Sequence, residues 1–238
     1  MSNLPTHSSF SRRRLLQYGG GLVGTSLMAT VLGGNPRSPL VAHAQGSPLT
    51  PKEALTKLMA GNERFVTEKR TNRHQNRERL LEVAKGQNPF AAVLGCADSR
   101  VPVEIVFDQG LGDIFVCRVA GNIATSEEIG SLEFGTLVLG AKVLVVMGHG
   151  GCGAVKAALT GGELPGQIGS LIQSIETGSI TGSKTDPARL DQAIKTNVLA
   201  QVARLNQSPV IGELVTKNQL KVVGSFYDLD TGKVSWLS

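Results

Sequence analysis

Three short apolar runs in the middle of the chain restrict its fold more than any other feature. They lack the alternation of polar and apolar residues that a half-exposed strand shows, as expected for parallel strands covered on both faces. The runs are Ala91–Cys96, Ile114–Val119 and Val143–Met147. Helical patterns separate them, notably Ile129–Leu139 and Ala154–Leu159. This order predicts an α/β fold with a mainly parallel central sheet and flanking helices.

Helix and hairpin signals mark the two ends of the same region. Thr50-Pro51-Lys52-Glu53 is a capping box with proline at the first helical position, and it predicts the start of a helix. Asp186-Pro187 opens a long amphipathic pattern that reaches Leu205. A fourth strand, Lys221–Leu229, and an antiparallel edge strand, Val234–Leu237, are expected to complete the sheet.

The positive charge of the chain is concentrated in its first 44 residues. The net charge is +5, and residues 1–44 contain Arg12, Arg13, Arg14 and Arg37 with no acidic residue. The remainder has 24 − 4 = 20 basic and 19 acidic residues, a net charge of +1. The charge balance therefore gives no support to a nucleic-acid partner.

Residues 1–44 have the features of a twin-arginine signal peptide. Ser11–Gln17 contains the arginine pattern, and Tyr18–Leu32 is weakly apolar but too short and glycine-rich for a stable membrane span. Ala42-His43-Ala44 is a small-x-small cleavage pattern. We expect export machinery to recognise 1–44 and a mature domain to span 45–238. Its destination is a periplasm, or else a thylakoid lumen or the extracellular space. A tail with incidental arginines is the alternative.

Candidate metal ligands follow two of the predicted strands. Cys96 ends the first run, and His149-Gly150-Gly151-Cys152 comes directly after the third. The carboxyl ends of parallel strands lie at one edge of a sheet, where α/β proteins build their sites. One imidazole and two thiolates suit zinc, with a fourth position left for water or substrate. The spacing alone leaves open buried structural cysteines beside an ordinary histidine.

An acid and a guanidinium follow closely after Cys96. Asp98 and Arg100 lie two and four residues beyond it, and ionised side chains rarely line a core unpaired. The pair favours a catalytic site over a purely structural one. The alternative is a turn-capping aspartate followed by a surface arginine.

Together these two motifs identify a family. Cys96-Ala97-Asp98-Ser99-Arg100 combined with His149-Gly150-Gly151-Cys152 closely resembles the signature of the β-class carbonic anhydrases. The likeness covers Pro51–Leu237, including Arg118–Asn122 and Ser131–Gly135. It implies a zinc enzyme for the reversible hydration of carbon dioxide to bicarbonate and a proton. It also implies a homo-oligomer, either a dimer or an assembly of dimers.

The resemblance assigns roles to individual residues. One Zn²⁺ per subunit would be held by Cys96, His149 and Cys152, with Asp98 and Arg100 as the catalytic dyad. The substrate-binding positions would be Gln87, Phe115, Phe134 and Gly153, although both phenylalanines also suit ordinary core packing. Family members with a bicarbonate-regulated inactive state carry tryptophan where this chain has Val93. We therefore expect a metal site open to water near neutral pH.

Three other functions fit parts of the pattern. Hydrolysis of carbonyl sulfide or carbon disulfide would use the same scaffold and ligands. A non-catalytic zinc-binding module would need a closed site and no paired acid. A thiol redox protein would need a nearby resolving cysteine, which the sequence does not offer. Cys117 is interpreted as a small buried hydrophobe and His74 as an exposed side chain.

Overall fold

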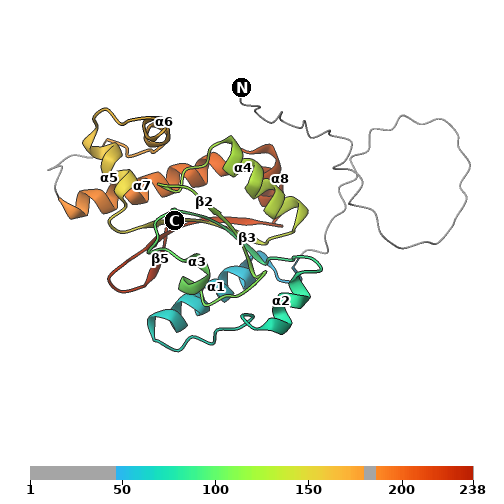
Figure 1. Ribbon diagram of the computed structural model, residues 1–238. Helices are drawn as coiled ribbons and strands as arrows, with labels where there is room; N and C mark the ends of the chain where they lie inside the picture. The colour runs from blue at the N-terminus through green and yellow to red at the C-terminus, as the bar shows by residue number, and fades with distance from the viewer. Residues whose placement is uncertain (1–46, 180–185, 238) are drawn as a thin grey trace, which may run out of the picture. The chain divides into compact units, whose positions relative to one another are not determined.

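A computed structural model describes residues 47–179 and 186–237 (Figure 1). The predicted signal peptide 1–44 lies outside the described residues. A five-stranded sheet with the order β2-β1-β3-β4-β5 forms the centre of the fold. All neighbours are parallel except β4 and β5, so the predicted α/β fold with an antiparallel edge strand is confirmed. The strands are β1 (Ala91–Gly95), β2 (Ile114–Arg118), β3 (Val143–His149), β4 (Lys221–Tyr227) and β5 (Val234–Leu237).

Helices lie on both sides of this sheet. In Figure 1, α1, α2 and α3 lie below it, whereas α4, α5, α7 and α8 lie above. None of the helices in the described part of the chain is long and apolar enough to cross a membrane. The helices are α1 (Pro51–Val66), α2 (Arg77–Val83), α3 (Val103–Val106), α4 (Ser126–Glu133), the π-helix η1 (Phe134–Val138), α5 (Gly153–Thr160), α6 (Ile168–Gln173), α7 (Pro187–Asn206) and α8 (Pro209–Thr216).

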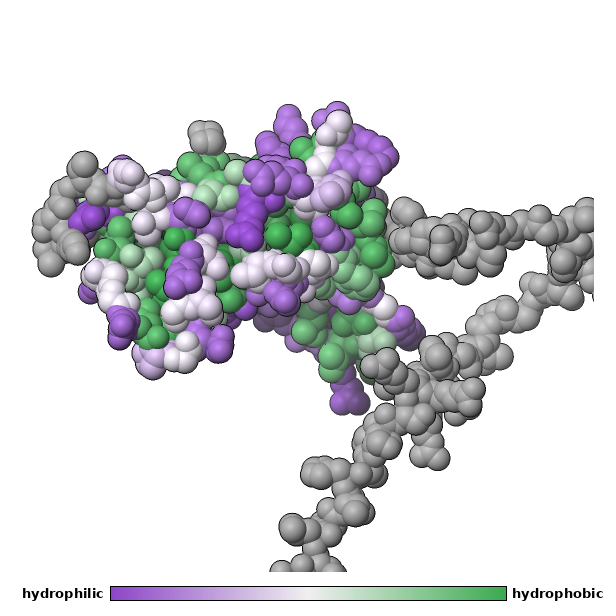
Figure 2. Space-filling view, turned by 90° about the horizontal axis from the view of Figure 1, so that it is seen from above, coloured by the Kyte–Doolittle hydropathy of each residue, from purple (hydrophilic) through white to green (hydrophobic). Residues whose placement is uncertain are grey.

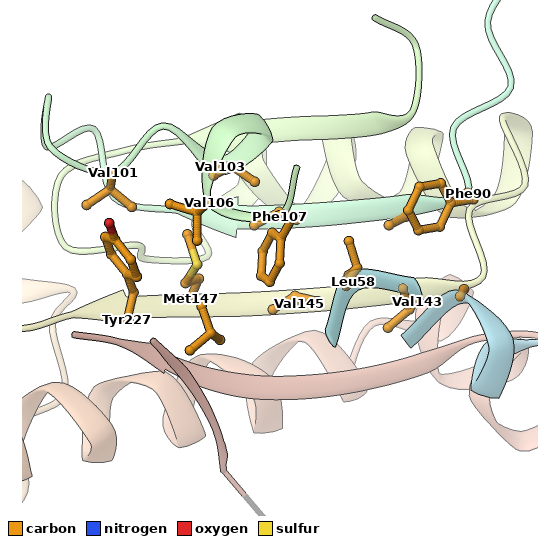
Figure 3. Packing of buried hydrophobic residues seen from close by; sticks show 14 residues of the cluster. Leu58, Phe90, Val101, Val103, Val106, Phe107, Val143, Val145, Met147 and Tyr227 are labelled. Carbon is orange, nitrogen blue, oxygen red and sulfur yellow. The ribbon is translucent and has the colours of Figure 1, made fainter. Parts of the chain in front are cut away.

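The central strands are apolar throughout because each face meets its own helical layer. Successive strand residues point to opposite faces. On the lower face, Val93, Val145 and Met147 pack with Leu58 of α1 and Val103 of α3 (Figure 3). The residues between them pack on the upper face; they include Ala92, Leu94, Leu144 and Val146, beside Val198 and Leu205 of α7. Strands β1 and β3 are therefore fully buried.

Both helix starts predicted from the sequence are confirmed. The Thr50 hydroxyl accepts a hydrogen bond from the Glu53 amide at 3.2 Å, and the Glu53 carboxylate accepts one from the Thr50 amide at 2.8 Å. At the start of α7, the Asp186 carboxylate accepts a hydrogen bond from the Ala188 amide at 2.9 Å. Each cap satisfies an amide that has no partner inside the helix.

Three segments differ from their predicted form. Strand β2 is only half-buried because it forms one edge of the sheet, and this leaves Cys117 half-buried as well. The predicted helix Ile129–Leu139 is divided into α4 and the π-helix η1. Strand β4 ends at Tyr227 rather than Leu229. There, Asp228 turns the chain by accepting hydrogen bonds from the amides of Asp230 and Thr231, both at 2.9 Å.

The packing of α1 on α3 depends on a glycine. A Cβ atom at Gly61 would collide with the backbone carbonyl of Phe107. We expect Gly61→Ala to lower the free energy of unfolding by at least about 2 kcal/mol, because backbone must move to admit the methyl group. Urea denaturation measures this. Gly130→Ala in α4 is the control, since a Cβ there meets no atom within 4 Å. Equal midpoints for the two variants would contradict the prediction.

Candidate metal centre

The sheet brings the three candidate ligands to one edge. Strands β1 and β3 are direct parallel neighbours, so their carboxyl ends lie side by side. Cys96 directly follows β1, His149 is the last residue of β3, and Cys152 caps the start of α5. Their sulfur and nitrogen ligand atoms all lie within 4.8 Å of one another, and all three residues are buried. The structure thus assembles the predicted Cys-His-Cys cluster.

The imidazole of His149 is oriented for a metal. Its Nδ1–H donates a hydrogen bond to the carbonyl oxygen of Gly150 at 3.0 Å, and this fixes the tautomer. Nε2 therefore carries the lone pair, is buried, and has no hydrogen-bond partner within the described residues. A buried polar atom left without a partner costs about 1–3 kcal/mol, which a coordinated cation would offset. A donor set of two cysteines and one histidine fits zinc.

The two cysteine sulfurs interact strongly. The pKa of Cys96 is lowered to about 4, first by the hydrogen bond from the Cys152 thiol and further by the neighbouring His149 imidazole and the Gly121 amide. The Gly121 N–H lies 3.3 Å from the Cys96 sulfur. The adjacent Cys96 sulfur and burial raise the pKa of Cys152 instead. The pair favours one thiolate on its own, and a divalent cation is the group that stabilises both sulfurs as thiolates.

Asp98 and Arg100 form a bidentate ion pair beside this cluster. The guanidinium donates from Nε to Oδ1 at 2.9 Å and from Nη2 to Oδ2 at 2.7 Å. The Arg100 amide adds a third hydrogen bond to Oδ1 at 2.9 Å. These bonds hold the pKa of Asp98 well below its usual range, so its carboxylate is a permanent acceptor at neutral pH. Oδ2 also lies 3.8 Å from Nε2 of His149.

Arg118 positions the segment between the ligand and the acid. From the end of β2, its Nε donates to the Cys96 carbonyl at 2.8 Å and its Nη2 donates to the Asp98 carbonyl at 2.6 Å. Neither bond involves a side chain of the site, so the arginine acts on the backbone alone. Arg118 belongs to the family-like stretch Arg118–Asn122, but the resemblance assigns it no role. The sequence feature that could have indicated its role is its position, at the end of a predicted strand next to the strand that leads to Cys96.

Comparison with known proteins identifies the family. The model of the carbonic anhydrase family matches residues 91–234. Carbonic anhydrase 2 of Mycobacterium tuberculosis is 39% identical over 188 residues, which cover 77% of this chain and 91% of that protein. The chain belongs to the β-class carbonic anhydrase family.

Solved structures agree with this assignment. One of two tetrameric β-carbonic anhydrases from the ascomycete Sordaria macrospora shares 27% identity with a TM-score of 0.62, covering 78% of this chain and 98% of that one. The β-carbonic anhydrase CafA of Aspergillus fumigatus shares 26% identity with a TM-score of 0.62, covering 77% and 90% of the two chains. This chain is therefore an enzyme with the fold of the β-carbonic anhydrases.

The substrate positions expected for a carbonic anhydrase lie in different places. Gly153 follows Cys152 as the first residue of α5 and is close to the ligands. Gln87, in contrast, precedes β1, whereas Cys96 follows that strand. Phe115 pairs with Ala92, four residues or about 13 Å along the strand from Cys96. Its ring packs beside the exposed ring of Phe134, with centroids 6.5 Å apart. A single chain therefore does not bring Gln87, Phe115 and Phe134 to the ligands.

His74 also lies away from this carbonic anhydrase site. Its side chain is exposed, and Nδ1 is 2.8 Å from the buried carboxylate of Asp113. Asp113 directly precedes β2, so the pair is located at the amino end of the sheet. Nothing in this arrangement connects His74 with the metal ligands.

The cluster predicts distinct effects for two cysteine substitutions. We expect Cys152→Ser to lower bound metal by at least tenfold, because the site would lose one of its two thiolates. Cys117→Ser is the matched control, since Cys117 lies on β2 outside the ligand cluster. Plasma mass spectrometry of the purified proteins measures the metal content of each variant, and Cys117→Ser should retain the wild-type content. Full occupancy in Cys152→Ser would contradict this ligand set.

Proposed function

We propose that the enzyme catalyses the zinc-dependent, reversible hydration of carbon dioxide to bicarbonate and a proton. One Zn²⁺ per subunit would be held by Cys96, His149 and Cys152. The observation that carries the proposal is the Asp98–Arg100 ion pair, 3.8 Å from a buried imidazole nitrogen that has no other partner in the described structure. It joins a three-ligand cluster to a fixed acceptor, and a structural zinc site needs no such acceptor.

The metal ligands, Asp98 and Arg100 would each have a separate role in the reaction. Bound zinc would lower the pKa of a water molecule from about 15.7 toward neutrality. Asp98 is placed to accept a hydrogen bond from that water molecule. This bond would fix the direction in which the water oxygen presents its lone pair to carbon dioxide. Arg100 keeps the carboxylate ionised and in place through its two parallel hydrogen bonds. The Asp98 side chain retains 17% exposure in the single subunit, so the site is close to solvent that can take up the released proton.

The ion pair and the number of ligands also distinguish the proposed enzyme from a structural zinc module and from a site closed to water. Within the described residues the cluster offers three Cys and His ligands, which supports a site with an open position rather than a closed structural one. Val93 lies buried inside β1, where members with the bicarbonate-regulated inactive state carry tryptophan. Its presence and the intact Asp98–Arg100 pair support a site open to water near neutral pH. No observation favours carbonyl sulfide or carbon disulfide as the substrate.

Stopped-flow hydration of carbon dioxide, followed with a pH indicator, tests the proposal. The zinc-loaded enzyme should accelerate the reaction, whereas Asp98→Asn should keep its zinc and lose at least about tenfold in kcat/KM. Because the asparagine amide cannot ionise to a carboxylate, raising the pH should not rescue the variant. Glu104→Gln is the control, because it likewise replaces a carboxylate by an amide but lies outside the cluster. A background rate from the zinc-loaded wild-type enzyme would refute the proposed activity.

We further propose that the enzyme is a homo-oligomer built on dimers that share their sites. Strand β2 forms an open, half-buried edge of the sheet. Helix α2 has no buried residue, and its Leu80 and Leu81 are 53% and 58% exposed. Apolar residues, green in Figure 2, also reach the surface of the face seen from above. Exposed apolar surface of this kind commonly marks an interface.

Two-fold symmetry would bring the predicted substrate-binding residues, which lie far from the ligands of their own subunit, close to the ligands of the partner. When two copies meet along β2 about a two-fold axis, their strands run in opposite directions. The amino end of one sheet then lies beside the carboxyl end of the other. Gln87 and Phe115 of one subunit would thereby approach the Cys96 of its partner. This supports the substrate-binding role of Gln87, Phe115 and Phe134 across an interface.

Mixing two inactive variants tests the shared site. Asp98→Asn and Gln87→Ala should each be impaired alone. After subunit exchange, half of the dimers are mixed, and one of the two sites in each mixed dimer has both residues intact. Activity should therefore recover to roughly a quarter of the wild-type value. If the mixture is no more active than the mean of the separate variants, Gln87 does not act across an interface.

Export through the twin-arginine pathway remains our proposal for residues 1–44, with the periplasm as the expected destination. It is supported by the arginine pattern and the small-x-small motif in the sequence. Replacing Arg12 and Arg13 by lysine should retain the protein in the cytoplasmic fraction of a bacterial host. Unchanged export of that variant would argue against the signal.

A further inference from the structure

Two buried amides of α7 hold the loop that contacts Cys96. The loop comprises residues Gly121–Ala124, and its first amide donates the 3.3 Å hydrogen bond to the Cys96 sulfur. Nδ2 of Asn197 donates to the carbonyl oxygen of Gly121 at 2.9 Å. Oε1 of Gln201 accepts from the Ala124 amide, also at 2.9 Å. Both ends of the loop are thus tied to one helix.

The loop has two consecutive residues in the left-handed region of the backbone. They are Gly121 and Asn122, with φ angles of 77° and 44°. Asn122 is 1% exposed, yet its side-chain amide finds no hydrogen-bond partner among the described residues. The turn has one hydrogen bond of its own, from the Asn122 amide to the Val119 carbonyl at 3.0 Å. A non-glycine residue in the left-handed region also depends on surrounding groups, and the hydrogen bonds from α7 contribute to that constraint.

The two amides are themselves fixed in place. Gln201 Nε2 donates to Asn197 Oδ1 at 3.0 Å, and the same oxygen accepts from the Glu176 amide at 3.1 Å. Asn197 and Gln201 are 0% and 1% exposed, so no water competes for these bonds. Ile175 also packs closely on the loop, since a Cβ at Gly121 would lie 2.7 Å from its side chain. The Gly121 amide has little freedom to leave the sulfur.

We propose that Asn197 and Gln201 are positioning residues for the metal centre. Acting through the 121–124 loop, they hold the Gly121 N–H against Cys96 and so set how strongly that thiolate donates electrons to the metal. The inference rests on the zinc site proposed above. Groups that hydrogen-bond a metal ligand commonly alter metal affinity or activity by about 10–100-fold. Helix α7 therefore extends the metal centre beyond its ligands and the Asp98–Arg100 pair.

Metal binding and a spectroscopic signature test this role. The variants are Asn197→Ala and the near-isosteric Gln201→Met. Leu205→Ala is the control, because Leu205 is equally buried on α7 and packs in the apolar cluster above the sheet. Zinc affinity is measured by competition with a chromogenic chelator, and thermal melting reports stability. In the Co²⁺-substituted proteins, the thiolate-to-cobalt charge-transfer band reports the donor strength of the sulfurs.

We expect both variants to bind zinc more weakly than wild type, by up to about tenfold because they act one bond further from the ligand than the Gly121 amide, and to shift the charge-transfer band. Leu205→Ala should lower the melting temperature while leaving the affinity and the band unchanged. If Asn197→Ala does not fold, Gln201→Met decides alone. Wild-type affinity and an unshifted band in the folded variants would overturn the inference while leaving the zinc site intact. Failure of the wild-type chain to bind either metal would instead overturn the zinc site.

Discussion

The parallel pairing of β1 with β3 is the contact on which the rest of the site depends. It places residues at the end of one strand beside residues at the end of another, although Cys96 and His149 are more than 50 positions apart in the sequence. A shift of this register by one residue would turn every strand side chain to the other face. Since both faces are filled by different apolar clusters, such a shift is strongly disfavoured. The core thereby determines the geometry of the candidate metal ligands.

The features that the sequence predicted well are those with a local or periodic signal. The apolar runs at Val93 and Val145 have no polar alternation, and burial on both faces is their direct cause. Thr50 and Asp186 predict helix starts because the capping hydrogen bonds join residues at most three positions apart. The sequence patterns do not predict four short helices: α2, α3 and α6, at four to seven residues each, show too little periodicity, and α8 begins only three residues after α7 ends.

The supporting groups of the site were harder to find because their partners are distant in the sequence. Arg118 acts through two backbone carbonyls, and backbone acceptors leave no trace in the residue pattern. Asn197 and Gln201 are four positions apart beside the apolar stripe of α7, a spacing that suits a solvated helix edge equally well. Only the fold shows that both are buried against the 121–124 loop. Gln87 matched the family by position, but one chain places it at the opposite end of β1.

The uneven exposure of the site has a consequence for its response to salt. In the single subunit the side chain of Arg100 is 55% exposed, so dissolved anions can reach its guanidinium and compete with Asp98. Cys96, His149 and Cys152 are at most 3% exposed and are hardly screened. Ionic strength therefore acts on the orientation of the carboxylate and leaves the ligand cluster almost untouched. We expect added chloride to weaken the Asp98–Arg100 pair at concentrations that leave the buried ligand cluster undisturbed.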